Sequence, residues 1–359
     1  EKRKKRTGRR QQVNAKRADL RVRDFTIVEN SSDHAHPAGL LFVRVWGQLA
    51  YIATDASRWS GLCTGDILFQ GADTRGSIGR DALHRTGISS GRHFMQQFEI
   101  AIVGGGLAGL VAALALGRTG RRVCLVAADA ASTDSRTTAL MDQSVRYLER
   151  LRVWDLIAPS TAPLAVMQII DGTTRLLRAP PAQFRAMDIS LPAFGYNIPN
   201  KALMEVLESA VDGERNVTRI KTSASSVAIH SDKATISLAD GKVIEAEFVV
   251  GADGRNSITR EAAAIGVRKW SYQQSAVVMN FGHALPHSNV STEFHTETGP
   301  FTQVPLPGSR SSLVWVVRPE EAARLTRLPS EELAAAVESR MQSMLGKVTL
   351  ESVPQAWPL

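Results

Sequence analysis

Cysteine is nearly absent from this chain of 359 residues, which contains only Cys63 and Cys124. The two cysteines form neither a CxxC nor a CxxxxC pair, which excludes a redox-active dithiol and a disulfide framework. Long apolar runs are also missing. The longest, around Leu107–Leu116, is far shorter than the roughly 20 residues that a membrane helix needs. The composition therefore indicates a globular protein of a reducing compartment without a transmembrane segment.

Methionine is absent before Met95, and the positive net charge lies in the same region. Residues 1–94 contain 17 Lys and Arg against 9 Asp and Glu, whereas the remainder has 26 of each. Apart from a short run near Leu40–Ile52, residues 1–94 show little helical or strand periodicity. We therefore expect a disordered basic leader, or sequence outside the native protein, and no specific nucleic-acid binding. An inactive scaffold whose leader binds nucleic acid or acidic lipid is the alternative from a different class.

Metal-ligand and nucleophile patterns are missing as well. His283 and His287 are four residues apart, but Gly282 and Pro286 disfavour a helix between them, so we predict no metal site. No Ser/His/Asp set stands out, and the catalytic residues stay unknown. If the protein is an enzyme, a cofactor supplies the reactive chemistry.

A glycine-rich turn follows the first strand-like segment after the leader. Phe98–Val103 is mostly apolar, Gly104-x-Gly106-x-x-Gly109 follows, and Leu110–Leu116 continues as an apolar helix. The first glycine permits the tight turn, the second lets a pyrophosphate approach the backbone, and the third lets the helix pack on the strand. Free N–H groups of the helix N-terminus then face the phosphates. The pattern predicts a dinucleotide site, and a glycine-rich turn without a ligand is the plainer alternative.

A second motif follows a wholly apolar strand end. Residues 217–250 have the pattern of a β-meander with a hairpin turn at Asp240-Gly241. Their last strand leads into Gly251-Ala252-Asp253-Gly254 and is expected to rejoin the parallel sheet. Asp253 then lies at a strand's carboxyl end, where α/β sheets bind ligands and a carboxylate can accept hydrogen bonds from ribose hydroxyls. Taken alone, Asp-Gly is more often a plain turn.

Further elements follow from periodicity. Residues 136–151 and 200–211 carry apolar stripes at helical spacing. Strand patterns occur at residues 166–177, 277–281, 291–295 and 311–317, with turns expected at Pro305, Pro307 and Gly308. Ser330 is a candidate N-cap for a helix with a buried stripe of Leu333, Val337, Met341 and Met344. These patterns predict a second β-sheet with a covering helix.

Taken together, five segments resemble the FAD-dependent ubiquinone-biosynthesis hydroxylases, which are aromatic flavoprotein monooxygenases with the para-hydroxybenzoate hydroxylase fold. The segments are residues 102–109, Arg136-x-x-Ala139-Leu140, Tyr196–Asn200, Val250–Arg260 and Ser311–Trp315. The resemblance covers residues 97–359. It implies an α/β fold with a Rossmann-like FAD-binding domain, an inserted β-meander and a second β-sheet substrate domain. Residues 95–165 and 197–265 would form the FAD-binding domain, and residues 166–196 and 266–359 the substrate domain.

Site residues follow from the same resemblance. Residues Gly104, Gly106, Leu107, Ala108 and Gly109 would hold the FAD pyrophosphate. Arg136 would lie at the phosphate and flavin side, and Asn200 near the cofactor. Asp253 and Gly254 look like the family's Asp-Gly motif, which serves FAD and is linked to the nicotinamide donor. Trp315 could line the substrate pocket, although a core position is at least as compatible with the sequence.

The resemblance also implies a reaction. NAD(P)H reduces FAD, O₂ adds to form a flavin hydroperoxide, and its distal oxygen is transferred to the aromatic ring of a polyprenylated phenol. We expect a cytoplasmic protein with peripheral contact at the inner face of the membrane, in complex with other ubiquinone-biosynthesis proteins. A related flavoprotein that hydroxylates another aromatic compound or reduces an isoprenoid is the alternative.

Two departures from the family pattern affect this hypothesis. The acidic residue that usually binds the adenosine ribose is expected near Ala127, and Asp129 is a candidate substitute. The chain ends at Leu359, before the family's Gly-Asp motif, which predicts a C-terminally truncated protein with half of a flavin site. An inactive FAD-binding fragment is therefore a further alternative.

Overall fold

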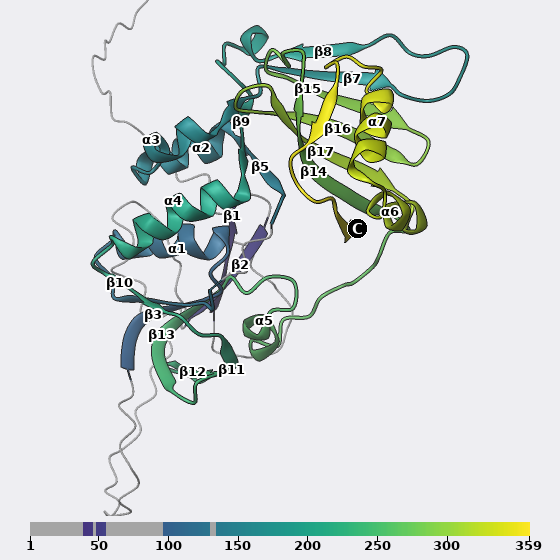
Figure 1. Cartoon of the computed structure of the whole chain (residues 1–359). Helices are drawn as coiled ribbons and strands as arrows, with labels where there is room; N and C mark the ends of the chain where they lie inside the picture. The colour runs from purple at the N-terminus through teal and green to yellow at the C-terminus, as the bar shows by residue number, and fades with distance from the viewer. Residues whose placement is uncertain (1–38, 46–47, 55–95, 130–133) are drawn as a thin grey trace, which may run out of the picture.

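The chain folds into two bodies, each built around a β-sheet (Figure 1). The computed structural model describes residues 39–45, 48–54, 96–129 and 134–359. The first sheet has four neighbouring parallel strands in the order β13-β3-β4-β10. Their bounds are β3 Gln96–Val103, β4 Val123–Val126, β10 Val217–Ile220 and β13 Val243–Gly251. The predicted return of the last strand to the parallel sheet is confirmed.

Alternating side chains of β3 and β4 enter two different cores. Ile100, Ile102 and Leu125 pack with the helices α1 (Leu107–Gly117) and α4 (Asn200–Asp212) on one face. Ala101 and Cys124 pack on the other face with the antiparallel strands β11 (Ala224–Ile229) and β12 (Ala234–Leu238). Because both faces are covered there, β4 and the buried end of β3, Ile100–Val103, are apolar throughout. Burial raises the pKa of the Cys124 thiol to about 12, so this thiol is not a nucleophile at neutral pH.

A hairpin extends the first sheet beyond β13. Its strands are β1 (Gly39–Val45) and β2 (Gln48–Thr54), and β2 pairs antiparallel with β13. This hairpin contains the short run in residues 1–94 for which the sequence shows periodicity. The other residues of the expected leader lie outside those that the structure describes.

A small sheet connects the two bodies. It consists of β5 (Thr137–Met141), β9 (Gly195–Pro199) and β6 (Ala162–Pro163), with β9 in the centre. The prediction of one helix from residue 136 was wrong, because residues 137–141 pair along β9 and the helix α2 begins only at Asp142 and ends at Arg150. Two short helical segments, α3 (Trp154–Ile157) and η2 (Ala158–Ser160), follow α2.

The second sheet has the order β18-β14-β17-β16-β15-β7-β8, and β19 also pairs with β14. The bounds are β7 Val166–Asp171, β8 Ala182–Arg185, β14 Ser275–His283, β15 Val290–Thr296, β16 Gly299–Leu306, β17 Arg310–Val317, β18 Val348–Leu350 and β19 Gln355–Pro358. The strand β16 was not predicted. Pro305 pairs with Ser311 inside it instead of forming a turn, whereas Gly308 occupies the turn with φ +79°.

Helices cover one face of the second sheet. α6 (Pro319–Leu325) and α7 (Ser330–Arg340) pack on Phe281, Phe301 and other buried side chains. Of the predicted stripe, Leu333, Val337 and Met341 are buried and Met344 is half-buried, and the two methionines follow the end of α7. The N-cap prediction was wrong, since Pro329 holds that position and no side chain caps the helix. A short helix, α5 (Ile258–Ala262), lies between the two bodies in the sequence, and η3 (Ala186–Ile189) follows β8.

No helix in the described ranges is long and apolar enough to span a membrane.

Candidate functional site

The glycine-rich turn lies between β3 and α1, and its three motif glycines have different surroundings. Gly104 has φ +110°, and a Cβ there would lie 2.2 Å from the Ala252 carbonyl oxygen. A Cβ at Gly109 would lie 1.9 Å from the Gly104 carbonyl oxygen. Both positions therefore require glycine for the turn to close. At Gly106, by contrast, a Cβ would meet no described atom within 4 Å.

Gly106 is also the N-cap of α1. No side chain caps the helix, and its first turn contains no acidic residue. The N–H groups of the first turn thus have no side-chain cap, a Cβ at Gly106 would have room among the described residues, and the helix dipole favours an anion there. This arrangement can accept a pyrophosphate.

The Asp253 motif directly contacts the glycine-rich turn. The Ala252 N–H donates a hydrogen bond to the Val103 carbonyl at 2.7 Å, and Ala252 is the residue that Gly104 approaches. Asp253 Oδ2 accepts hydrogen bonds from the Thr259 N–H at 3.1 Å and its hydroxyl at 3.2 Å. Asp253 Oδ1 is buried and has no partner among the described residues. Since a buried acceptor normally has a donor, this oxygen suits a ligand hydroxyl.

Arg136 and Asn200 meet through Asp134, a residue that the sequence did not indicate. The Arg136 guanidinium donates two hydrogen bonds to the Asp134 carboxylate, from Nε at 2.7 Å and from Nη2 at 2.8 Å, and the Arg136 backbone N–H donates a third at 3.0 Å. Asn200 Nδ2 donates to the same carboxylate at 3.0 Å, while Asn200 Oδ1 accepts from the Thr138 hydroxyl at 2.6 Å. Burial raises the pKa of Asp134, but the hydrogen bonds from Arg136 and Asn200 outweigh it and hold the pKa at about 2. Asp134 and Arg136 therefore form a charged ion pair at neutral pH.

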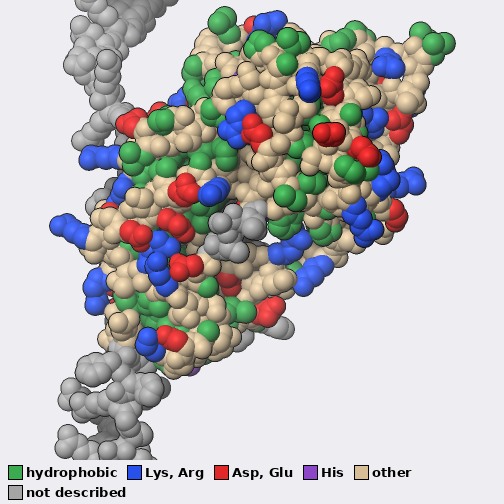
Figure 2. All heavy atoms as spheres, viewed as in Figure 1, with side chains coloured by type: hydrophobic (Ala, Val, Ile, Leu, Met, Phe, Trp, Pro, Cys, Tyr) green, Lys and Arg blue, Asp and Glu red, His purple; other side chains and the backbone are tan. Residues whose placement is uncertain are grey.

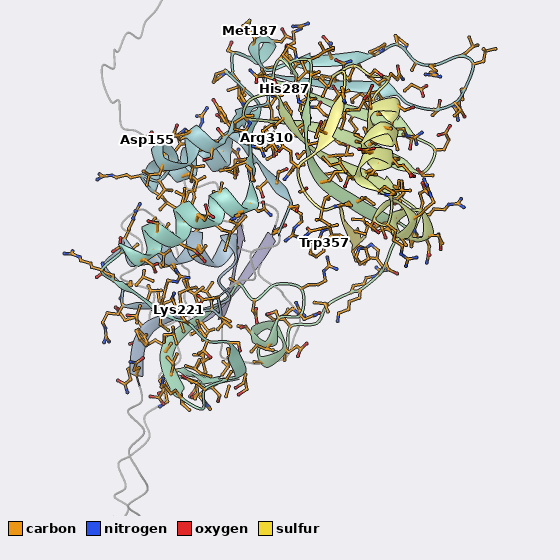
Figure 3. The ribbon with its side chains drawn as sticks, viewed as in Figure 1. Asp155, Met187, Lys221, His287, Arg310 and Trp357 are labelled. Atoms are coloured by element: carbon orange, nitrogen blue, oxygen red, sulfur yellow. The ribbon has the colours of Figure 1, made fainter. Side chains whose placement is uncertain are left out.

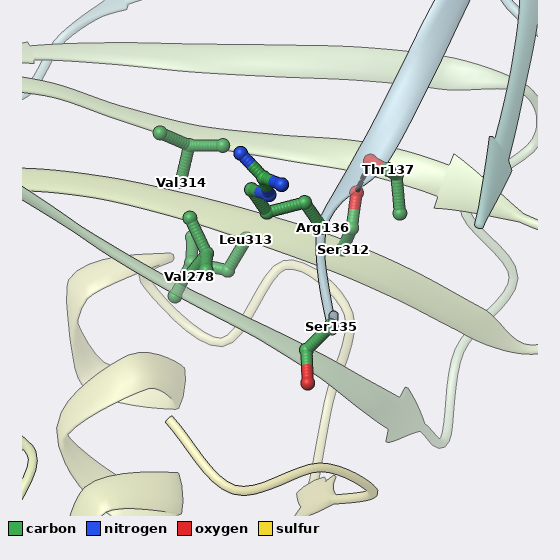
Figure 4. Close-up of a pocket in the computed structure, with 7 residues that line it drawn as sticks. All are labelled: Ser135, Arg136, Thr137, Val278, Ser312, Leu313 and Val314. Carbon is green, nitrogen blue, oxygen red and sulfur yellow. Dashed lines mark hydrogen bonds between the residues drawn. The ribbon is translucent and has the colours of Figure 1, made fainter. Parts of the chain in front are cut away.

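A cavity of about 140 Å³ adjoins Arg136, between β5 and the face of the second sheet opposite α6 and α7 (Figure 4). Its lining residues are Ser135, Arg136, Thr137, Val278, Ser312, Leu313 and Val314. The Thr137 and Ser312 hydroxyls are hydrogen-bonded across it at 3.0 Å. The Arg136 guanidinium lies 4.5 Å from the centre of the Trp357 ring. Figure 3 shows Trp357 on the side of the second body that faces the first body. The cavity thus combines apolar walls with hydroxyls and one cation.

Two candidate residues lie away from these features. Trp315 is a core residue, 7% exposed, and its ring packs edge-on against Phe301 at 5.1 Å. It packs in the core with residues of α6 and α7, so of the two alternatives for this residue the core position is the one found. The Asp129 side chain is 71% exposed and pairs with Lys221 at 3.6 Å. Ala127, which follows β4, packs closely on the glycine-rich turn. A Cβ added at Gly105 would lie 2.4 Å from the Cβ of Ala127.

The signals for Asp134, Ser312 and Val278 in the sequence were weak or absent. Asp134 precedes Arg136 by two residues, which suggests only a local turn, and Ser312 and Val278 lie inside ordinary strand patterns. Metal ligation has no candidate here, since the described ranges contain no group of three or more His, Cys, Asp or Glu suited to an ion.

A parallel sheet, a glycine-rich turn at a helix N-terminus and a carboxylate at the next strand end define a dinucleotide-binding α/β protein. Residues 97–358 match the FAD binding domain family, and the chain belongs to that family. Its cofactor is FAD. The open space at Gly106 and the unpartnered Asp253 oxygen fit such a ligand.

Curated relatives include ubiquinone hydroxylases. The chain is 33% identical to the ubiquinone hydroxylase UbiL of Rhodospirillum rubrum over 258 residues, which cover 70% of this chain and 59% of that protein. It is 32% identical to the 3-demethoxyubiquinol 3-hydroxylase of Escherichia coli over 264 residues, which cover 71% and 66%. The chain thus spans less than two thirds of the length of either relative.

A solved structure shares the fold. PqsL of Pseudomonas aeruginosa, described as a probable FAD-dependent monooxygenase, superposes with a TM-score of 0.61 at 23% identity. The match covers 74% of each chain.

Proposed function

We propose that this protein is an FAD-dependent monooxygenase that hydroxylates the aromatic ring of a polyprenylated phenol in ubiquinone biosynthesis, with NAD(P)H and O₂ as cosubstrates. The observation that carries the cofactor assignment is the close contact of Gly104 with Ala252, which brings the glycine-rich turn beside Asp253. The names of the two curated relatives support the substrate class.

The cofactor contacts in this proposal come from both motifs and from Arg136. The turn formed by Gly104, Gly106, Leu107, Ala108 and Gly109 binds the pyrophosphate through backbone N–H groups. Asp253 accepts a hydrogen bond from a hydroxyl of the cofactor, and Gly254, which has φ +78°, allows the backbone to come close. Arg136, positioned by Asp134 and Asn200, supplies a positive charge on the flavin side.

The cavity beside Arg136 would receive the aromatic ring. When bound, FAD supplies the activation of O₂ and the transfer of one oxygen atom to the ring, with electrons from NAD(P)H. Val278 and Val314 exclude water and hold the ring, because a wet site favours loss of the activated oxygen as peroxide. The Thr137 and Ser312 hydroxyls can orient a phenolic oxygen. In this proposal residues 95–165 and 197–265 form the FAD-binding domain and residues 166–196 and 266–359 the substrate domain.

A polyprenylated substrate lies in the membrane, so the proposal includes a cytoplasmic protein with peripheral contact at its inner face. It also includes association with other proteins of ubiquinone biosynthesis.

Isotope labelling of the product tests the function. The protein, loaded with FAD, is incubated with NAD(P)H, heavy-isotope O₂ and either a polyprenylated phenol or a soluble phenol, and the products are analysed by mass spectrometry. We expect one heavy oxygen atom in the prenylated product, and none when FAD is omitted. Turnover of the soluble phenol alone, or reduction of the prenyl chain without oxygen incorporation, would contradict the assignment.

A further inference from the structure

The hairpin of β7 and β8, together with η3, exposes an unusual number of large apolar side chains. Leu176 is 100% exposed, Leu177 89% and Met187 84%. Met167, Phe184 and Ile189 are also exposed, and we call these six residues the β7–β8 surface. Hydrophobic and basic side chains lie along the upper edge of the molecule in Figure 2, and Met187 lies at the same edge in Figure 3. An apolar cluster of this kind normally marks an interaction site.

The β7–β8 surface is formed by the register of the two strands and by hydrogen bonds that hold their connecting loop. Met167 on β7 lies directly opposite Phe184 on β8, so both point to the same side of the hairpin. The connecting loop carries Leu176 and Leu177, and Figure 1 shows that it extends beyond the second sheet. Asp171 fixes the loop base by accepting hydrogen bonds from the Thr173 hydroxyl at 2.6 Å and from the Ala179 N–H at 3.1 Å. The two leucines are thus held at the tip of a projecting loop.

Arginines flank the two leucines at the loop tip, whereas the neighbouring carboxylates are Asp171 at the loop base, Asp188 beside Met187, and Glu297, which accepts a hydrogen bond from the Thr174 N–H at 2.8 Å. Arg175, Arg178 and Arg185 are exposed, and residues 173–187 contain no acidic residue. Arginines that flank exposed leucines can contact lipid phosphates while the leucines enter the acyl region. Each basic residue near an anionic bilayer adds to the attraction.

We propose that the β7–β8 surface docks on a bilayer that contains anionic lipid, with Leu176 and Leu177 inserted at the interface. A second copy of this chain is the alternative occupant, because in a symmetric dimer the same patch meets itself, and the experiment below separates the two. This docking proposal rests on the proposed function, because a polyprenylated substrate would lie in the membrane. Lipid binding and hydroxylation are measured in separate experiments, so one proposal can be wrong while the other holds.

Vesicle sedimentation with the full chain tests the proposal. The probes are phosphatidylcholine vesicles with and without phosphatidylglycerol. We expect binding to the anionic vesicles, and a loss of about tenfold or more in the partition coefficient for Leu176→Ser/Leu177→Ser. Arg175→Gln/Arg178→Gln should weaken binding to anionic vesicles by a similar factor. All four side chains are exposed, so the variants should fold.

Matched controls separate this surface from other attachments. Leu156→Ser/Val353→Ser and Arg215→Gln/Arg327→Gln change exposed residues elsewhere and should bind like the unmodified protein. If all variants bind equally, another part of the chain makes the contact and the proposal is wrong. If the protein ignores vesicles but sediments as a dimer in the ultracentrifuge, and Leu176→Ser/Leu177→Ser makes it monomeric, the surface is a contact between copies and the proposal is also wrong.

Discussion

At the scale of single residues, the glycines of the first turn have separable roles. Gly104 and Gly109 have no room for a methyl group, because backbone atoms lie 2.2 Å and 1.9 Å from where it would be. Gly106 has room, and its φ of −71° suits any residue. Folding therefore requires the first and third glycines, whereas we attribute the second to the proposed approach of the pyrophosphate.

The Asp253 carboxylate gives a prediction at this scale. Asp253→Ala should weaken FAD binding by about 1.5–3 kcal/mol, because a charged hydrogen-bond acceptor is lost. Flavin fluorescence titration measures the affinity. Thr259→Val is the matched control, since it removes the hydroxyl partner of Oδ2 but leaves the carboxylate. Equal FAD affinity of Asp253→Ala and the unmodified protein would argue against a cofactor contact.

Single residues also show which features of the site could be predicted from the sequence and which could not. The tight turn at the glycines and the place of Asp253 after a strand end were predicted because both depend on local sequence pattern, whereas their roles toward FAD stay a prediction. Asp134 was missed because its role arises from pairing with Arg136 and Asn200, which is 66 residues away from it. Trp315 was ambiguous because strand alternation does not tell which of two covered faces a residue occupies.

At the scale of elements, a polar network joins three strands of the second sheet. His283 Nδ1 lies 2.7 Å from the Leu285 carbonyl oxygen, so Nδ1 carries the proton. The Ser311 hydroxyl can then donate to Nε2 at 3.0 Å, while it accepts from Gln303 Nε2 at 2.7 Å. Neutral His283 therefore completes the hydrogen bonds among β14, β16 and β17.

This network predicts a pH dependence. Burial lowers the pKa of His283 below its ordinary 6.5, so the unfolded chain takes up a proton before the folded chain does. Neutral His283 therefore contributes fully to the free energy of unfolding above pH 6.5, and this contribution decreases as the pH falls below 6.5. Chemical unfolding at neutral and mildly acidic pH should show a smaller pH dependence for His283→Gln than for the unmodified protein. His230→Gln, at an exposed position, is the control. The same pH dependence in His283→Gln would contradict the assignment.

Elements with mixed signals were the ones predicted poorly. Residues 136–151 carry a helical stripe, but Thr137 and Thr138 are β-branched and pair with β9, so tertiary pairing overrode the local pattern. β16 contains Pro300 and Pro305, which normally argue against a strand.

At the scale of the whole molecule, buried polar contacts join the two bodies. Asn197 on β9 is 1% exposed and donates to the Pro305 carbonyl at 2.9 Å and to the Ser312 hydroxyl at 3.3 Å. Asn280 on β14 donates to the Ser135 carbonyl at 3.2 Å. These contacts surround the cavity, so its shape depends on how the bodies pack.

Asn197→Ala should therefore uncouple the two bodies. We expect a loss of about 1–3 kcal/mol in the free energy of unfolding, because two buried groups lose their donor. Separate unfolding transitions should become visible by calorimetry. Asn216→Ala removes contacts inside the first body and should keep the transitions as coupled as in the unmodified protein. Unchanged coupling in Asn197→Ala would show that other contacts hold the bodies together.

The two-sheet architecture was predicted from sequence, because each sheet has its own strand patterns and the glycine motif orients the first. The packing of one body on the other was not predicted, since no sequence motif indicates that Asn197, Ser312 and Asn280 make contacts between the two bodies.

FAD affinity of Gly106→Ala tests the central claim most directly, because a methyl group there meets no described residue within 4 Å and enters the space that we assign to the pyrophosphate. The measurement is a flavin fluorescence titration of the full chain, with circular dichroism and thermal unfolding as checks of the fold. We predict an unchanged fold and an FAD affinity at least about tenfold weaker, equivalent to about 1.4 kcal/mol. A folded Gly106→Ala protein that binds FAD as tightly as the unmodified chain would contradict the account.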